Sequence, residues 1–218
     1  MTMLFSDDSE LPRRRFVTRA AAAFAALSAG FASTAHAVEP ALDGDDSEHD
    51  AWMTGIKAKH RQFFHGLDLG ERPMLMAGNF LDAYRDAYGA KPDEARAVIG
   101  VHGSALAIAF NDAAWTKYGF GKNANLIDPA TKEPAVRNLY ATGGPLSVDT
   151  LQKRGVVFLA CNTALRLLST SVAKARNESY ESVYEDLKSS RLPGIILVPA
   201  MVVAVNRSQE AGFTYLRA

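Results

Sequence analysis

The chain has 218 residues, with 24 basic and 24 acidic side chains and a formal net charge of zero. No basic stripe with interleaved aromatic residues stands out, which argues against nucleic-acid binding. The chain contains one cysteine, so it forms no intrachain disulfide and has no cysteine cluster for a haem or an iron–sulfur centre. We therefore expect no nucleic-acid partner, no cofactor and no metal site.

Residues 1–37 have the composition of a bacterial export signal. The pair Arg13-Arg14 resembles the core of a twin-arginine signal, an alanine-rich apolar run follows, and Ala35 and Ala37 frame a small-x-small cleavage site. An uncleaved membrane anchor is the alternative, but the run is shorter than the roughly 20 residues that a membrane helix needs. The sequence predicts cleavage after Ala37, a periplasmic location and no membrane attachment after cleavage.

Residues 38–55 follow the signal and are acidic, punctuated by Gly and Pro, and poor in aliphatic side chains (VEPALDGDDSEHDAWMT). Such a segment buries too little apolar surface to fold by itself, so we expect a flexible leader. Residues 56–218 are long enough for one α/β domain with a substantial core.

The hydrophobic pattern of residues 56–218 alternates between strands and helices. Apolar runs typical of strands lie at 62–65, 95–101, 155–161, 195–198 and 213–216. Helical patterns cover 73–88, 105–115 and 180–189, and further helices begin at 162 and 199. Residues 117–146 lack periodicity, as expected of a functional or partly disordered loop. This alternation predicts a parallel sheet with helices on both faces.

Two reactive side chains follow strands, at the edge where open parallel sheets bind ligands. His102 follows the run ARAVIGV, and Cys161 follows VVFLA and immediately precedes a helix that Asn162 and Thr163 are expected to cap. The free N–H groups of a helix N-terminus favour a thiolate, and a nearby histidine could accept or return a proton. Structural roles remain open, because free cysteines are often packed in cores and a histidine after a strand often only stabilises a turn.

Three segments resemble the DsrE/DsrF-like family, namely VIGVHGSALAIAF, RGVVFLACNTALR and LPGIILVPAMVVAVNRSQEAGFTYL. The resemblance covers about residues 60–216. It implies a three-layer α/β/α sandwich with a five-stranded, mostly parallel sheet in the order 4-3-2-1-5, which would place His102 and Cys161 at one pocket. Sulfur-handling members are typically homo-oligomers or hetero-oligomers, and we expect this chain to form a homo-oligomer, either a dimer or a trimer. In sulfur-handling members, the cysteine at the position of Cys161 accepts sulfur as a persulfide and passes it on.

The leading hypothesis is a periplasmic sulfur relay in which Cys161 is the nucleophile and His102 adjusts its protonation. A sulfur donor or acceptor protein would be a further partner. One alternative is a non-catalytic small-ligand-binding protein, and another is a structural subunit that binds its partner through residues 117–146. An exposed sulfur in a pocket favours the relay, and a buried sulfur favours the binding protein. The residues expected to contact a ligand are Gly103, Ser104, Asn162, Thr163 and Arg137.

Overall fold

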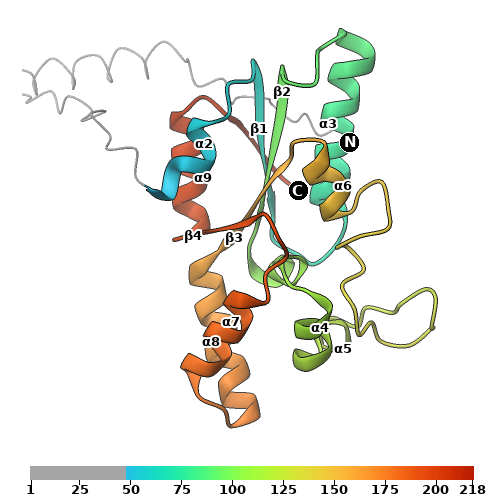
Figure 1. Ribbon diagram of the computed structural model, residues 1–218, viewed down its shortest axis with the longest axis vertical. Coiled ribbons are helices and arrows are strands. Elements are labelled where there is room, and N and C mark those ends of the chain that lie inside the picture. The colour runs from blue at the N-terminus through green and yellow to red at the C-terminus, as the bar shows by residue number, and fades with distance from the viewer. Residues whose placement is uncertain (1–47) are drawn as a thin grey trace, which may run out of the picture. The chain divides into compact units, whose positions relative to one another are not determined.

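The computed structural model describes residues 48–218, so the predicted export signal and most of the predicted leader lie outside the described residues. One sheet contains five strands, β1 (His60–Gly66), β2 (Ala95–Val101), β3 (Val157–Cys161), β4 (Ile195–Val198) and β5 (Thr214–Arg217). All neighbouring strands are parallel, and their order is β4-β3-β2-β1-β5. The predicted α/β fold and strand order are confirmed (Figure 1).

Helices cover both faces of the sheet (Figure 1). One face carries α3 (Arg72–Tyr88) and α6 (Val148–Lys153), and the other carries α2 (Ala51–Thr54) and α9 (Met201–Glu210). Successive strand residues point to opposite faces. Phe63 accordingly packs on Trp52 of α2, with ring centroids 6.5 Å apart, whereas Phe64 packs on Phe80 of α3 at 5.8 Å. The long apolar runs of the sequence are therefore strands that are buried on both faces.

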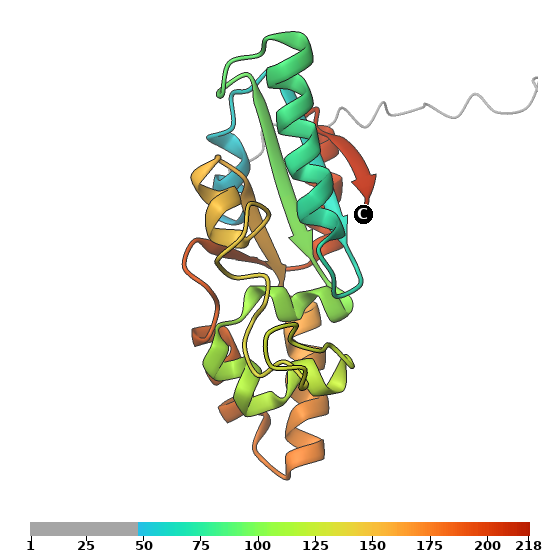
Figure 2. The same ribbon diagram turned by 90° about the vertical axis from the view of Figure 1, so that its right-hand side faces the viewer.

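Further helices lie beyond the carboxyl ends of the strands, as both views show (Figures 1 and 2). They are the 3-10 helix η2 (Gly103–Ala109), α4 (Asp112–Tyr118), α5 (Phe120–Asn123), α7 (Asn162–Arg176) and α8 (Tyr180–Ser189). Among residues 48–218, no helix has the length and apolar character needed to cross a membrane.

The helix predicted over 105–115 is wrong, because the chain forms η2 and then α4, with a break between them. Asn111 provides the cap of α4, since its side chain accepts a hydrogen bond from the N–H of Ala114 at 3.0 Å. Ser104 directly precedes the predicted helix, but its hydroxyl accepts a hydrogen bond from the N–H of Leu69 at 3.0 Å. Ser104 and Asn111 lie seven residues apart, and contacts with distant segments decide which of the two caps a helix.

The expectation of a flexible leader is wrong for residues 48–54. Glu48–Asp50 form a 3-10 helix (η1) that continues into α2, and Trp52 is only 9% exposed. Asp50 forms an ion pair with Arg207 of α9, with an N···O distance of 2.6 Å. A single tryptophan in an acidic segment produces no periodic pattern, so its burial against the sheet was not evident from the sequence.

Residues 117–146 are ordered by buried polar side chains rather than by long helices or strands. The amide of Asn138 donates to the carbonyls of Ile108 (2.9 Å) and Phe110 (2.7 Å) and accepts from the N–H of Tyr140 (2.9 Å). Asp128 is also buried and accepts a hydrogen bond from the N–H of Ala130 at 2.9 Å. The contacts of Asn138 fasten the segment to the end of η2, and that of Asp128 orders the segment internally.

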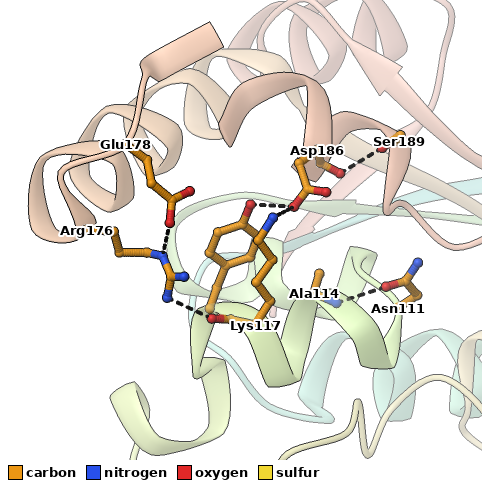
Figure 3. A network of polar contacts seen from close by, with 8 residues as sticks. Asn111, Ala114, Lys117, Arg176, Glu178, Asp186 and Ser189 are labelled. Atoms are coloured by element: carbon orange, nitrogen blue, oxygen red, sulfur yellow. Dashed lines mark hydrogen bonds and ion pairs between the residues drawn. The ribbon is translucent and has the colours of Figure 1, made fainter. Parts of the chain in front are cut away.

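A polar network joins α4 to the hairpin formed by α7 and α8 (Figure 3). The hydroxyl of Tyr118 and the ammonium of Lys117 both donate to Asp186 of α8, the latter at 3.0 Å. Arg176 at the end of α7 donates to the carbonyl of Lys117 at 3.0 Å and to Glu178 at 2.7 Å. Burial and the neighbouring Asp186 raise the pKa of Tyr118. The hairpin is thereby held to the rest of the domain beyond the sheet.

Candidate functional site

The candidate site lies at the carboxyl edge of the sheet. In the strand register, Val101 of β2 pairs with Ala160 of β3, so the next pair along the two strands is His102 and Cys161. Residues paired in parallel strands project to the same face. The structure thus brings the two principal predicted site residues to neighbouring positions on the face that α9 covers.

Cys161 is buried, with 2% of its surface exposed. Its Sγ accepts hydrogen bonds from two backbone N–H groups, that of Ala164 in the first turn of α7 at 3.4 Å and that of Met201 at the start of α9 at 3.3 Å. Two helix N-termini therefore direct N–H groups at one sulfur atom. Helix N-termini carry partial positive charge, so this arrangement stabilises a negatively charged sulfur.

Cys161 itself caps α7, which corrects the prediction that Asn162 and Thr163 cap this helix. The side-chain oxygen of Asn162 accepts from the hydroxyl of Tyr184 at 2.8 Å, and the hydroxyl of Thr163 donates to the carbonyl of Pro199 at 3.2 Å. Both side chains therefore make contacts with neighbouring elements. Asn162 directly follows Cys161 in the sequence, and Thr163 comes next.

Gly103 permits the tight turn after His102. Its φ is 61°, and an added Cβ would lie 2.7 Å from the carbonyl oxygen of Leu67, so both backbone conformation and space require glycine. Gly103 and Ser104 line a cavity of about 220 Å³ whose other walls are mostly apolar, formed by Leu69, Leu106, Ala107, Phe120, Asn123, Ala124, Leu168 and Val172. Neither His102 nor Cys161 lines this cavity. Gly103 and Ser104 therefore face a different space from the sulfur of Cys161.

Arg137 lies apart from the other predicted site residues. Its guanidinium binds Asp128 within the 117–146 segment, with an N···O distance of 2.9 Å. The N–H of Ala130 and the guanidinium of Arg137 hold the pKa of Asp128 below its usual range. The contact that the structure assigns to Arg137 is therefore an internal ion pair.

Sequence reasoning missed His65, which lies beside His102. The two imidazole centroids are 5.7 Å apart, and His65 is 9% exposed. The His65 Nδ1 lies 3.1 Å from the hydroxyl of Tyr215 in β5. Its Nε2 and the Nδ1 of His102 are both buried without a hydrogen-bond partner among the described residues. Burial, followed by the charges of His102 and Arg217, lowers the pKa of His65.

The signal that could have revealed this pair is positional. Both histidines stand at the carboxyl ends of apolar runs that form adjacent strands, and both lie on the face that carries Cys161. His60 belongs to the same strand as His65, and its ring stacks on Tyr84 with ring centroids 4.2 Å apart. His60 lies at the opposite end of β1.

Comparison with known proteins identifies no family for the chain. No protein-family model and no curated protein matches it. Among solved structures, it is similar to one described as a protein of unknown function, MTH1491 from Methanobacterium thermoautotrophicum. The two share 17% sequence identity over 73% of this chain and 99% of that chain, with a TM-score of 0.40. A similarity at this level carries no argument about function, which has to be inferred from the site.

Proposed function

We propose that this protein carries sulfane sulfur on Cys161 as a persulfide. The observation that supports the proposal most directly is the pair of backbone N–H groups, from Ala164 and Met201, that both bind Sγ. These donors stabilise an anionic sulfur without a charged side chain. The resemblance to sulfur-handling DsrE/DsrF-like proteins supports the same reading.

The transfer is balanced without an added oxidant or reductant. The Cys161 thiolate attacks the terminal sulfur of a persulfide donor R–S–SH, so that the Sγ–S bond forms while the donor S–S bond breaks and its electron pair leaves as R–S⁻. An acceptor thiolate then attacks the terminal sulfur of Cys161–S–SH, and Cys161 leaves as the thiolate. His102 would exchange the proton of the terminal sulfur.

Burial of the sulfur places one condition on this relay. Because only 2% of the surface of Cys161 is exposed, a donor reaches Sγ only when the chain around it moves. Burial also favours a second candidate function, a non-catalytic small-ligand-binding protein in which Cys161 is a packed helix cap. The two functions differ in whether the folded protein ever exposes the sulfur.

Incubation of the folded protein with polysulfide should therefore add the mass of one sulfur atom, removable by reductant. Intact-protein mass spectrometry measures the addition. The substitution Cys161→Ser should abolish it, and His102→Ala should slow it. The control is alkylation of the wild type with and without denaturant. If the folded protein gains no sulfur and Cys161 is alkylated only after unfolding, the relay is refuted and the binding protein is favoured.

We also propose export through the twin-arginine pathway, on the evidence of the pair Arg13-Arg14, the alanine-rich run that follows it and the cleavage site that ends at Ala37. That pathway depends on paired guanidinium groups, and lysine lacks their planar geometry. Replacing both arginines with lysine should leave the precursor in the cytoplasm, as measured by cell fractionation. The control is the reverse exchange outside the signal, in which Lys57 and Lys59 are both replaced with arginine. This variant should be exported like the wild type. Normal periplasmic levels of the Arg13/Arg14 variant would contradict the proposal.

We further propose that the protein forms a homo-oligomer. The outer surface of α9 exposes two adjacent valines, Val202 (71% exposed) and Val203 (51% exposed), and α7 exposes Leu167 (65%). Apolar side chains grouped on a helix surface are typical of protein contacts. A homo-oligomer would cover them.

A further inference from the structure

We propose that His65 and His102 bind a soft monovalent transition-metal ion such as Cu(I), with the thioether of Met201 as a third ligand. The proposal does not depend on the sulfur relay, and the composition of the chain had suggested no metal site. It rests on the two imidazoles, on the placement of Met201 and on the charges around them.

The first argument is the pair of buried ring nitrogens. Nε2 of His65 and Nδ1 of His102 have no hydrogen-bond partner among the described residues, although their ring centroids are only 5.7 Å apart. An unsatisfied buried polar group is costly, and such groups in native proteins commonly indicate a bound water or ion. Two imidazole nitrogens in adjacent rings are a typical start for a metal site.

The second argument is the contact between His65 and Tyr215. The hydroxyl oxygen of Tyr215 lies 3.1 Å from Nδ1 of His65, and in the tautomer protonated at Nδ1 it accepts that hydrogen, so that the free lone pair is on Nε2. Histidines that bind metals usually make such a bond through the other ring nitrogen, because it fixes tautomer and orientation.

The third argument concerns Met201. A Cβ added at Gly100 would collide with the Sδ of Met201, so the thioether lies directly over this strand position. Gly100 pairs with His65 in the register of β1 and β2 and precedes His102 by two residues on the same face. The absence of a side chain at Gly100 leaves room that the Sδ of Met201 and the ring of Phe63 share, on the face of the sheet that carries both histidines.

The donor set selects the ion. In the part of the chain that the structure describes, no three His, Cys, Asp or Glu side chains gather in a way that could hold a metal. Zn²⁺ normally takes at least three such ligands, whereas thioether and imidazole together suit Cu(I). Arg217 pairs with His65 in the sheet and adds positive charge, which disfavours a divalent ion more than a monovalent one.

The test is an anaerobic Cu(I) titration of the purified protein against a chromogenic chelator, with ascorbate as reductant. One equivalent should bind to the wild type. His65→Ala and His102→Ala should each weaken binding by more than about 100-fold, and Met201→Leu by about tenfold. His60→Ala is the matched histidine control and should bind like the wild type. Cys161→Ser should also retain the ion. Unchanged affinity in both site-histidine variants, or loss of the ion in Cys161→Ser, would overturn the proposal.

A second measurement needs no variant and so covers the case in which a substitution prevents folding. Ag(I), a diamagnetic soft ion, is added to the wild-type protein and the histidine ring nitrogens are followed by NMR. Nε2 of His65 and Nδ1 of His102 should shift together at one equivalent, while both ring nitrogens of His60 stay unchanged. Shifts confined to other histidines, or no shifts, would contradict the site.

Discussion

Replacing Trp52 with alanine should destabilise the domain by about 3 kcal/mol, in the range measured for large aromatic residues in cores. The indole packs edge-to-face against Phe63 (ring centroids 6.5 Å apart) and Phe213 (6.3 Å). The substitution therefore leaves a cavity between α2 and the sheet. Urea unfolding, followed by far-UV circular dichroism, measures the change in the free energy of unfolding.

Tyr88→Ala provides the matched aromatic control, because this residue is 78% exposed at the end of α3. Its cost should stay within about 0.5 kcal/mol, as is usual for surface substitutions. Equal, small effects at both positions would mean that residues 48–54 do not pack on the sheet in solution. The prediction reverses the expectation from composition, under which this segment contributes little to stability.

Replacing Asn138 with alanine should cost about 3 kcal/mol, because three buried backbone groups lose their partner at once. They are the carbonyls of Ile108 and Phe110 and the N–H of Tyr140. The loss should also loosen the segment 117–146, since Asn138 joins it to η2. Urea unfolding gives the free energy, and hydrogen exchange of this segment reports the loosening.

Asn138→Asp separates the donor role from the acceptor role at this position. A carboxylate can still accept from the N–H of Tyr140 but cannot donate to the two carbonyls, and it places a charge in a buried site. We therefore expect a destabilisation that grows as the pH rises and the carboxyl ionises. Asn206→Ala, on the exposed side of α9, is the control. A stable Asn138→Asp variant at neutral pH would show that the two carbonyl contacts contribute little.

The strands were predictable because their local pattern is strong. The predicted strands at 95–101 and 195–198 have the same bounds as β2 and β4. Continuous apolar runs of this length favour buried strands. The third strand begins two residues later than predicted. Gly155 adopts a φ of 85°, a turn conformation that its place beside an apolar run did not reveal.

Contacts between distant segments decided what the sequence could not. Asn111 caps α4 rather than Ser104, because the hydroxyl of Ser104 binds a loop 35 residues away. The cap of α7 is a sulfur atom, which capping preferences for oxygen side chains do not anticipate.

The candidate site was predictable only in part, because it also depends on contacts between distant segments. The strand order that the resemblance implies places His102 and Cys161 at neighbouring strand ends, as the strand register does. The positions of His65 beside His102 and of Met201 over Gly100 depend on the strand register and on the return of α9, which no local pattern contains.

The pairing of β1 with β5 also affects how the protein folds while the ribosome is still making it. Gln62 pairs with Thr214, and the N–H of Ala218 donates to the carbonyl of His65 at 3.0 Å. A nascent chain therefore has one edge of β1 unpaired until the ribosome has made about 150 further residues. During that interval the exposed edge can pair with another nascent chain, as unpaired strands do. Misassembly is thus a hazard of translation itself, and chaperones that shelter β1 should raise the yield of the native protein.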